Sequence, residues 1–190
     1  MEKMAGVLAD RLYDEHKFPA VSYDAFQYVI EFALEMAAGI FASAVIAVLF
    51  DMKWETAVFL MIFWILRSYA GGIHLDAFWQ CFLFSAAVMA GTVALVKYLE
   101  MPMWGSHMMF LGGVLAFLVT EPVNDKNRHV DQEEDAYFRK KLCESFLAIV
   151  AAYLFCLFTN NSRYMFLIAV TVVMVYVLMI LGKIKNGKIK

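Results

Sequence analysis

Long apolar stretches separated by short polar ones make up most of the chain from residue 25 onward. A helix needs about 20 apolar residues to cross a hydrocarbon core about 30 Å thick. Because lipid offers no hydrogen-bond partners, a helix is the form in which such a stretch satisfies its own backbone. The pattern therefore predicts an all-α integral membrane protein with about six transmembrane helices. The apolar segments cover residues 25–50, 55–69, 77–98, 103–120, 142–158 and 164–181.

The first 18 residues follow a different pattern, in which apolar side chains recur at helical spacing and charged side chains lie between them. This pattern predicts a short amphipathic helix that Pro19 closes. Residues 1–18 would then be an interfacial segment on the membrane surface. A solvated helix packed on the rest of the protein accounts for the pattern equally well. The apolar positions are Met4, Val7, Leu8 and Leu12.

The composition agrees with a membrane protein. Hydrophobic residues make up 63% of the chain and charged residues 18%, against about 45–50% and about 25% in soluble domains. The net charge of −2, without a basic patch, gives no indication of nucleic-acid binding. The three cysteines show no C-x-x-C spacing, so we expect neither disulfides nor structural zinc, and no other metal or cofactor. Residues 1–190 are interpreted as a single membrane-embedded domain.

One long polar stretch, residues 121–141, interrupts the apolar segments. Asp131 and Glu134 have the spacing of a helix cap, so the second half of this stretch is predicted to be a helix that runs into the membrane. With both termini inside, the inner segments carry thirteen Lys and Arg and the outer loops carry three. This bias predicts a multi-pass protein of the cell membrane with both termini in the cytoplasm. Residues 67–81 and 121–141 then share the cytoplasmic side and can build one site.

The residues with most potential for chemistry lie around the junction of the second and third apolar segments. Arg67, Gly71, Gly72, His74 and Cys81 fall within fifteen residues there. Ionisable side chains at a membrane are functional candidates because lipid makes them costly to keep. A Cys near a His can act as a nucleophile, since the His takes the thiol proton and the thiolate attacks. A buried structural Cys and a hydrogen-bonded core His are the alternative.

The spacing of His74 and Cys81 decides how they can meet. On one straight helix, side chains seven positions apart would lie about 10 Å apart along the axis, too far for a hydrogen bond. Gly71 and Gly72 predict a turn that folds His74 back over the start of the helix carrying Cys81. The N-terminus of that helix would favour the thiolate form of Cys81.

Other residues with chemical potential are weaker candidates. Cys143 and Cys156 have no His within a few positions and are predicted to be packing residues. The methionines around His107 form at most a weak soft-metal pattern, because methionine is common throughout the chain. Gly112 and Gly113 permit close contact with another helix.

Two motifs stand in order along this chain. The first is Arg-x-x-x-Gly-Gly-x-His with a Cys seven residues after the His, here Arg67 to Cys81. The second comes two apolar segments later and combines Pro-Val-x-x-x-Asn-Arg, from Pro122, with Arg-Lys-Lys and Ser, from Arg139 to Ser145. Together with the chain length and the number of segments, these motifs resemble the accessory gene regulator B (AgrB) family of Gram-positive quorum sensing. The resemblance covers nearly the whole chain.

Members of that family are membrane cysteine endopeptidases, and the resemblance implies the same activity here. They cut the C-terminal part from a small propeptide and help to close the remainder into a thiolactone, the precursor of an autoinducing peptide. His74 and Cys81 match the family's catalytic pair. The implied partners are an AgrD-like propeptide and the lipid bilayer, with a homodimer left open. The active site would lie on the cytoplasmic side.

Four residues near this pair are possible oxyanion or substrate-binding residues, namely Gln80, Arg67, Gly71 and Gly72, and the first two each have more than one interpretation. Gln80 could stabilise the oxyanion together with the Cys81 backbone N–H, or could be a polar residue at the interface. Arg67 could bind a carboxylate of the substrate, or could pair with Asp76 or Glu121.

The alternative function is a peptide exporter or channel without covalent chemistry, which the predicted helices and their polar positions would also suit. The chain contains no G-x-x-x-x-G-K-[ST] loop, which excludes an ATP-driven pump.

Overall fold

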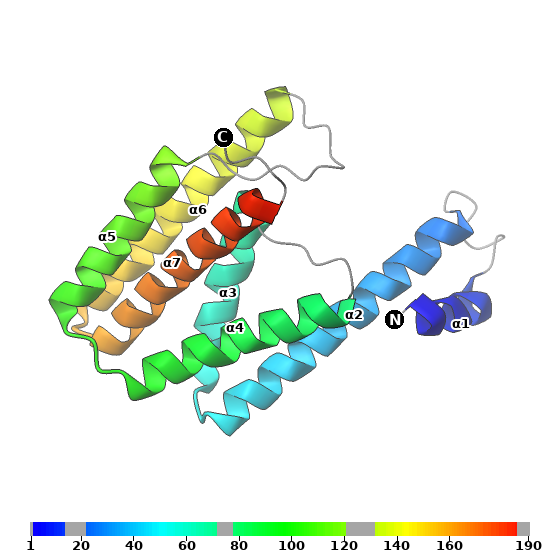
Figure 1. Cartoon of the computed structure of the whole chain (residues 1–190), viewed down its shortest axis with the longest axis horizontal. Coiled ribbons are helices and arrows are strands. Elements are labelled where there is room, and N and C mark those ends of the chain that lie inside the picture. The colour runs from blue at the N-terminus through cyan, green and yellow to red at the C-terminus, as the bar shows by residue number, and fades with distance from the viewer. Residues whose placement is uncertain (1, 14–21, 72–77, 121–131, 186–190) are drawn as a thin grey trace.

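Helices account for nearly all of the described chain, which comprises residues 2–13, 22–71, 78–120 and 132–185 of the computed structural model (Figure 1). No strand occurs in these residues, and the predicted all-α class is confirmed. Each predicted apolar segment forms one helix, and one further helix precedes them. The helices are α1 (Glu2–Leu12), α2 (Tyr23–Leu49), α3 (Lys53–Ala70), α4 (Phe78–Tyr98), α5 (Met103–Val119), α6 (Gln132–Phe158) and α7 (Ser162–Lys185).

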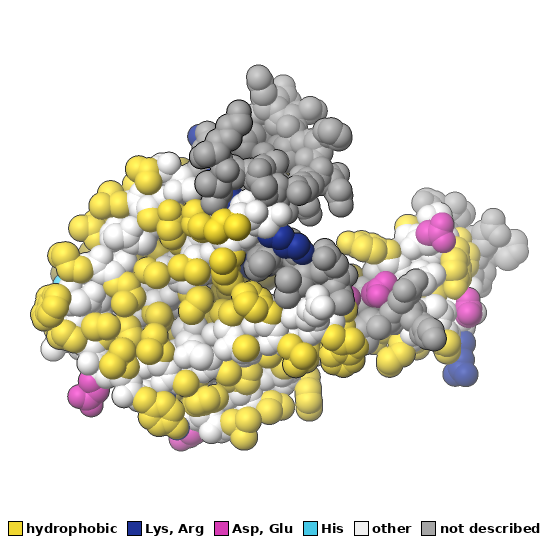
Figure 2. Space-filling view, in the orientation of Figure 1, with side chains coloured by type: hydrophobic (Ala, Val, Ile, Leu, Met, Phe, Trp, Pro, Cys, Tyr) yellow, Lys and Arg dark blue, Asp and Glu magenta, His cyan; other side chains and the backbone are white. Residues whose placement is uncertain are grey.

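Four of the described helices, α2, α4, α6 and α7, are long and apolar enough to cross a membrane. α5 is a shorter apolar helix of 17 residues, and α3 has 18 residues but carries Lys53, Glu55 and Arg67. Apolar side chains are spread over the described surface that is visible in Figure 2, where charged side chains are sparse. The chain is therefore a multi-pass membrane protein. Crossings by α3 and α5, which the count of about six includes, stay a prediction.

α6 is one continuous helix of 27 residues. Its first part belongs to the polar stretch 121–141, so the helical second half predicted for that stretch is confirmed. A helix of this length spans about 40 Å, which exceeds the roughly 30 Å of a hydrocarbon core. The polar first turns of α6 can therefore extend beyond the apolar layer. Residues 121–131 lie outside the described residues.

α7 is the central helix of the bundle and contacts α3, α4, α5 and α6. Figure 1 shows it packed beside α5 and α6. Its buried side chains are apolar except for that of Thr171, whose hydroxyl donates to the carbonyl of Leu167 at 2.7 Å. A helix that is enclosed by neighbours needs no polar face, which explains its apolar sequence.

α5 and α7 approach each other closely at Gly113. This glycine is buried, and a Cβ atom built on it would lie 2.9 Å from Cγ1 of Val172 and 3.3 Å from Cγ2 of Val173. Gly112 is exposed, and a Cβ atom there would have nothing within 4 Å. The close contact predicted for the glycine pair is thus made by Gly113 and not by Gly112.

Charged side chains form contacts between helices at the end of the bundle where α3 and α7 begin. Nη1 of Arg163 lies 3.1 Å from Oε1 of Glu55, a buried residue. Lys97, in the last turn of α4, donates to the carbonyl of Phe50 at 2.6 Å. Because Cys81 lies in the first turn of α4, these contacts belong to the opposite end of the bundle from the candidate nucleophile.

α1 packs on α2 through small side chains. Ala5 and Ala9 are fully buried, whereas Met4, Val7 and Leu12 are more than half exposed. The predicted N-terminal helix is confirmed, and it packs on the protein as the second interpretation expected. Its exposed apolar side chains remain available for a membrane interface, so the interfacial position stays a prediction.

Candidate active site

The bend predicted before His74 begins at Gly71, directly after the last residue of α3. Gly71 has φ 73° and ψ −159°, and its N–H donates to the carbonyl of Arg67 at 3.2 Å. Side chains with a Cβ rarely adopt this conformation, so the position requires a glycine. Gly72 and His74 lie outside the described residues. The geometry of His74 relative to Cys81 therefore stays a prediction.

Cys81 is half-buried and is the fourth residue of α4. The N–H groups in the first turn of a helix have no carbonyl acceptor within that helix, and they carry its partial positive charge. In α4 these groups belong to Phe78, Trp79 and Gln80. The thiol thus occupies the helix start that the sequence predicted.

Arg67 and Cys81 come together across the bend. Arg67 lies in the last turn of α3 and is half-buried, and its guanidinium is within electrostatic range of the Cys81 thiol. α3 and α4 also contact each other. Among the predicted site residues that the structure describes, Arg67 and Cys81 are the pair whose side chains interact. Gln80 is exposed, and Asp76 lies outside the described residues.

Three aromatic rings contact one another at the start of α4. The ring of Phe78 lies 5.3 Å from that of Trp79 and 5.8 Å from that of Phe82, and the rings of Trp79 and Phe82 are 5.9 Å apart. Such edge and offset contacts are favourable beyond the burial of their area. The three rings therefore form a cluster at the end of α4 that also carries Cys81.

The first turns of α6 lie beside the end of α3. The rings of Tyr69 and Phe138 are 6.4 Å apart, and the Lys141 ammonium is within electrostatic range of Tyr69. These contacts bring the flank of the first motif next to the second motif. The described residues therefore agree with the prediction that both polar stretches lie at one end of the bundle.

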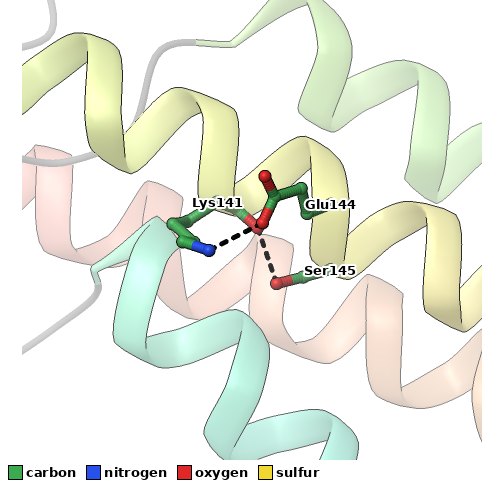
Figure 3. A network of polar contacts seen from close by, with 3 residues as sticks. All are labelled: Lys141, Glu144 and Ser145. Carbon is green, nitrogen blue, oxygen red and sulfur yellow. Dashed lines mark hydrogen bonds and ion pairs between the residues drawn. The ribbon is translucent and has the colours of Figure 1, made fainter.

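Within the basic run of α6, Lys141 has partners on its own helix (Figure 3). Its Nζ lies 2.8 Å from Oε2 of Glu144, and the hydroxyl of Ser145 donates to its carbonyl at 2.7 Å. Arg139 and Lys140 are exposed. Sequence reasoning overlooked Glu144, although its spacing from Lys141 is that of an ion pair on one helix face.

Tyr69 and Phe138 were also overlooked, and for them the sequence holds no signal. Each is an aromatic residue at the end of an apolar helix, a position that is common in membrane proteins. Their contact joins residues that are 69 positions apart, so it becomes visible only when α3 and α6 are seen side by side.

The remaining candidates are placed as follows. Cys156 packs against the larger core cluster, as predicted. Cys143 is exposed, so its prediction as a packing residue is wrong. His107 lies 3.0 Å, at Nδ1, from the hydroxyl of Tyr153, and this contact gives the histidine a structural role inside the bundle.

The sequence model of Accessory gene regulator B matches residues 1–180. The matched region includes both motifs and all helices except the end of α7. No curated protein and no solved structure matches the chain. The match extends over far more than half of the sequence, and the family is known as one of membrane peptidases that process AgrD propeptides in quorum sensing. The chain therefore belongs to the AgrB family.

Proposed function

We propose that this protein is a cysteine endopeptidase in which Cys81 is the nucleophile and His74 the general base. It would cleave the C-terminal part from an AgrD-like propeptide through an acyl-enzyme and pass the peptide to the propeptide's own Cys. One observation carries the assignment of the nucleophile: Cys81 lies at the start of α4, within electrostatic range of Arg67 across the bend at Gly71.

In the first step the imidazole of His74 takes the thiol proton, and the Cys81 sulfur attacks the scissile carbonyl carbon. The negative charge moves to the carbonyl oxygen. First-turn N–H groups of α4, with the Gln80 side chain, would donate hydrogen bonds to that oxygen. The C–N bond then breaks, His74 returns the proton to the leaving amine, and a thioester on Cys81 remains.

In the second step a thiol within the peptide attacks this thioester. His74 takes the proton of the peptide thiol, a C–S bond forms to the peptide's Cys as the bond to Cys81 breaks, and His74 returns that proton to the released Cys81 thiolate. The exchange is nearly isoenergetic because reactant and product are both thioesters, whereas hydrolysis is strongly downhill. The ring cluster of Phe78, Trp79 and Phe82, on the same helix end as Cys81, would support transfer if it limits the access of water to the thioester. An intramolecular thiol also has a high effective molarity.

Arg67 places a positive charge near the Cys81 thiol. An opposite charge favours the ionised form of a thiol, so Arg67 would stabilise the Cys81 thiolate before attack. This role adds to the two that the sequence suggested, binding of a substrate carboxylate and pairing with Asp76 or Glu121. Both of those acidic residues lie outside the described residues.

The site would face the cytoplasm, in a single domain with six crossings and both termini inside. Basic residues of the described chain support this orientation, since Arg67, Arg139, Lys140 and Lys141 all belong to the bundle end that carries Cys81. Cytoplasmic ends of membrane helices are the ones enriched in Lys and Arg. A homodimer stays open.

Cleavage assays with purified variants in vesicles test the proposal. Cys81→Ala and His74→Ala should each abolish cleavage of the propeptide while the protein keeps its helical circular dichroism. The double variant Cys143→Ala plus Cys156→Ala is the matched control and should remain active. An active Cys81→Ala variant would contradict the assignment, and an exporter or channel would show no cleavage with any variant.

A further inference from the structure

Tyr69 lies in the last turn of α3, two residues after Arg67, and its ring contacts that of Phe138 on α6. The two ring centroids are 6.4 Å apart, with an angle of 50° between the planes. Residues two positions apart on a helix differ by about 200° around its axis. The contact with α6 therefore lies on nearly the opposite side of α3 from Arg67, whose guanidinium is within electrostatic range of the Cys81 thiol on α4.

The buried side chains around Tyr69 also join α3 to α6. Leu66 and Ala70, one turn apart on α3, are fully buried and belong to the same core cluster as Leu142 and Phe146 of α6. Tyr69 itself is half-buried. The end of α3 is thus supported by α6 through apolar packing and through one aromatic pair.

The last turn of α3 needs such support because the end of a helix is its least stable part. The last four carbonyls of a helix have no donor within that helix, and helix ends fray. In α3 the N–H of Gly71 donates to the carbonyl of Arg67 at 3.2 Å, so opening of this turn would release the backbone of Arg67. The loss of one aromatic pair corresponds to roughly two- to ten-fold in an equilibrium constant. The contact with Phe138 is therefore strong enough to influence how often the turn opens.

We propose that Tyr69 is a positioning residue for Arg67, because its ring contact with Phe138 fixes the last turn of α3 on α6 and so holds the guanidinium near Cys81. The inference rests on the proposed function, in which Arg67 stabilises the thiolate. Tyr69 acts through Arg67 and contacts neither the substrate nor the reacting atoms.

The phenol of Tyr69 is also within electrostatic range of Lys141, whose ammonium lies 2.8 Å from Oε2 of Glu144. We assign the positioning role to the ring of Tyr69 and not to its hydroxyl, because the ring contacts Phe138. Other charged side chains on the helices that contact α3 are the same in every variant below, so they cause no difference between the variants. At this end of the bundle they include Arg139, Lys140, Lys183 and Lys185.

The test follows alkylation of Cys81 by iodoacetamide across neutral and alkaline pH, read by intact mass, in a protein with Cys143→Ala and Cys156→Ala. Tyr69→Ala should slow alkylation at neutral pH by roughly two- to ten-fold and move the profile to higher pH, because less thiolate forms when the guanidinium moves away from the sulfur. The rates should converge where all of the thiol is ionised. General loosening of the structure would instead expose the thiol and speed alkylation at every pH.

Three further variants show whether Tyr69 acts through its ring and through Arg67. Tyr69→Phe keeps the ring and should leave the profile unchanged. Arg67→Gln with Tyr69→Ala should be no slower than Arg67→Gln alone, since the positioned group is already gone. Phe138→Ala removes the same contact from α6, so it should reproduce the Tyr69→Ala shift, and it decides the question if Tyr69→Ala does not fold. Trp64→Ala, which removes a 67% exposed aromatic side chain from the same helix, is the matched control and should change nothing.

Four results would overturn the proposal. The first is an unchanged profile in a folded Tyr69→Ala or Phe138→Ala variant. The second is an equal shift in Tyr69→Phe, which would assign the effect to the hydroxyl. The third is a double variant slower than Arg67→Gln, which would mean that Tyr69 acts independently of Arg67, and the fourth is an equal shift in Trp64→Ala. The test uses no substrate, so a protein that shows the expected shift but does not cleave the propeptide would contradict the proposed function and not this inference.

Discussion

The guanidinium of Arg67, in the last turn of α3, lies within electrostatic range of the thiol of Cys81, in the first turn of α4. Both the half-buried Arg67 cation and the positive N-terminal end of α4 would therefore stabilise a negative charge on the sulfur. α3 ends at Ala70, and Gly71, the residue that follows it, has φ 73°. The proximity to Cys81 gives Arg67 a role that can be measured without any substrate.

Removing the charge of Arg67 should lower the reactivity of Cys81. In a protein with Cys143→Ala and Cys156→Ala, iodoacetamide alkylates Cys81 as its thiolate. Arg67→Gln should slow this alkylation at neutral pH roughly ten-fold, at the lower end of what a neighbouring opposite charge does to an ionisation. Arg67→Lys is the matched control and should recover most of the rate. Unchanged alkylation with lost cleavage would mean that Arg67 acts on the substrate instead.

A side chain at Gly71 should disturb the site more than the bundle. Gly71→Ala places a Cβ on a residue with φ 73°, which costs about 1–3 kcal/mol and favours another course of the chain after α3. We expect cleavage to fall at least ten-fold while helical circular dichroism is retained. Gly39→Ala, in open space within α2, is the control and should cleave normally. Normal cleavage by Gly71→Ala would show that the bend is not needed.

The two adjacent glycines of α5 should respond in opposite ways. Gly113→Ala brings a Cβ to 2.9 Å from Val172 and should destabilise the bundle by about 1–3 kcal/mol. Gly112→Ala meets nothing within 4 Å and should stabilise the helix by up to about 1 kcal/mol. Thermal unfolding in detergent measures both. Adding Val172→Ala should recover part of the Gly113→Ala loss, and equal melting temperatures for the two single variants would contradict the packing at Gly113.

The orientation of the chain can be read with reporter fusions. A reporter at the C-terminus or within residues 121–141 should report cytoplasm, because these segments carry most of the Lys and Arg. Reporters inserted near Pro102 or Asn160 should report the outside. A reporter within residues 121–141 that lies outside would place the second motif on the wrong side for a site shared with Cys81.

Much of the fold could be predicted because a helix that crosses a membrane needs an apolar stretch of about 20 residues, which can be recognised in the sequence. The predicted apolar segments and the helical part of residues 121–141 all appear as helices. Which side of a helix faces its neighbours was harder, because helices such as α5 and α7 are apolar all round. Gly112 and Gly113 differ by about 100° around α5, so only one of them meets Val172. Cys143 was misplaced because the lack of a nearby His, on which its prediction rested, does not indicate which side of α6 it lies on.

The candidate site was predictable in its parts and not in its contacts. A His, a Cys and a pair of glycines can be read from the sequence together with their spacing. The approach of Arg67 to Cys81 and of Tyr69 to Phe138 depends on how α3, α4 and α6 pack, which the spacing does not contain. Glu144 was the exception, since it could have been found from its spacing to Lys141.

The most direct test of the account uses a propeptide whose ring-forming Cys is replaced by Ala. Cys81 should still cleave it, but no internal thiol is then present to attack the thioester, and on the proposed mechanism water attacks it only slowly. Intact-mass analysis should then show the enzyme plus the N-terminal fragment, bound at Cys81 and removed by hydroxylamine. Prompt release of a linear peptide acid, without any adduct, would contradict transfer and make the protein an ordinary hydrolytic peptidase.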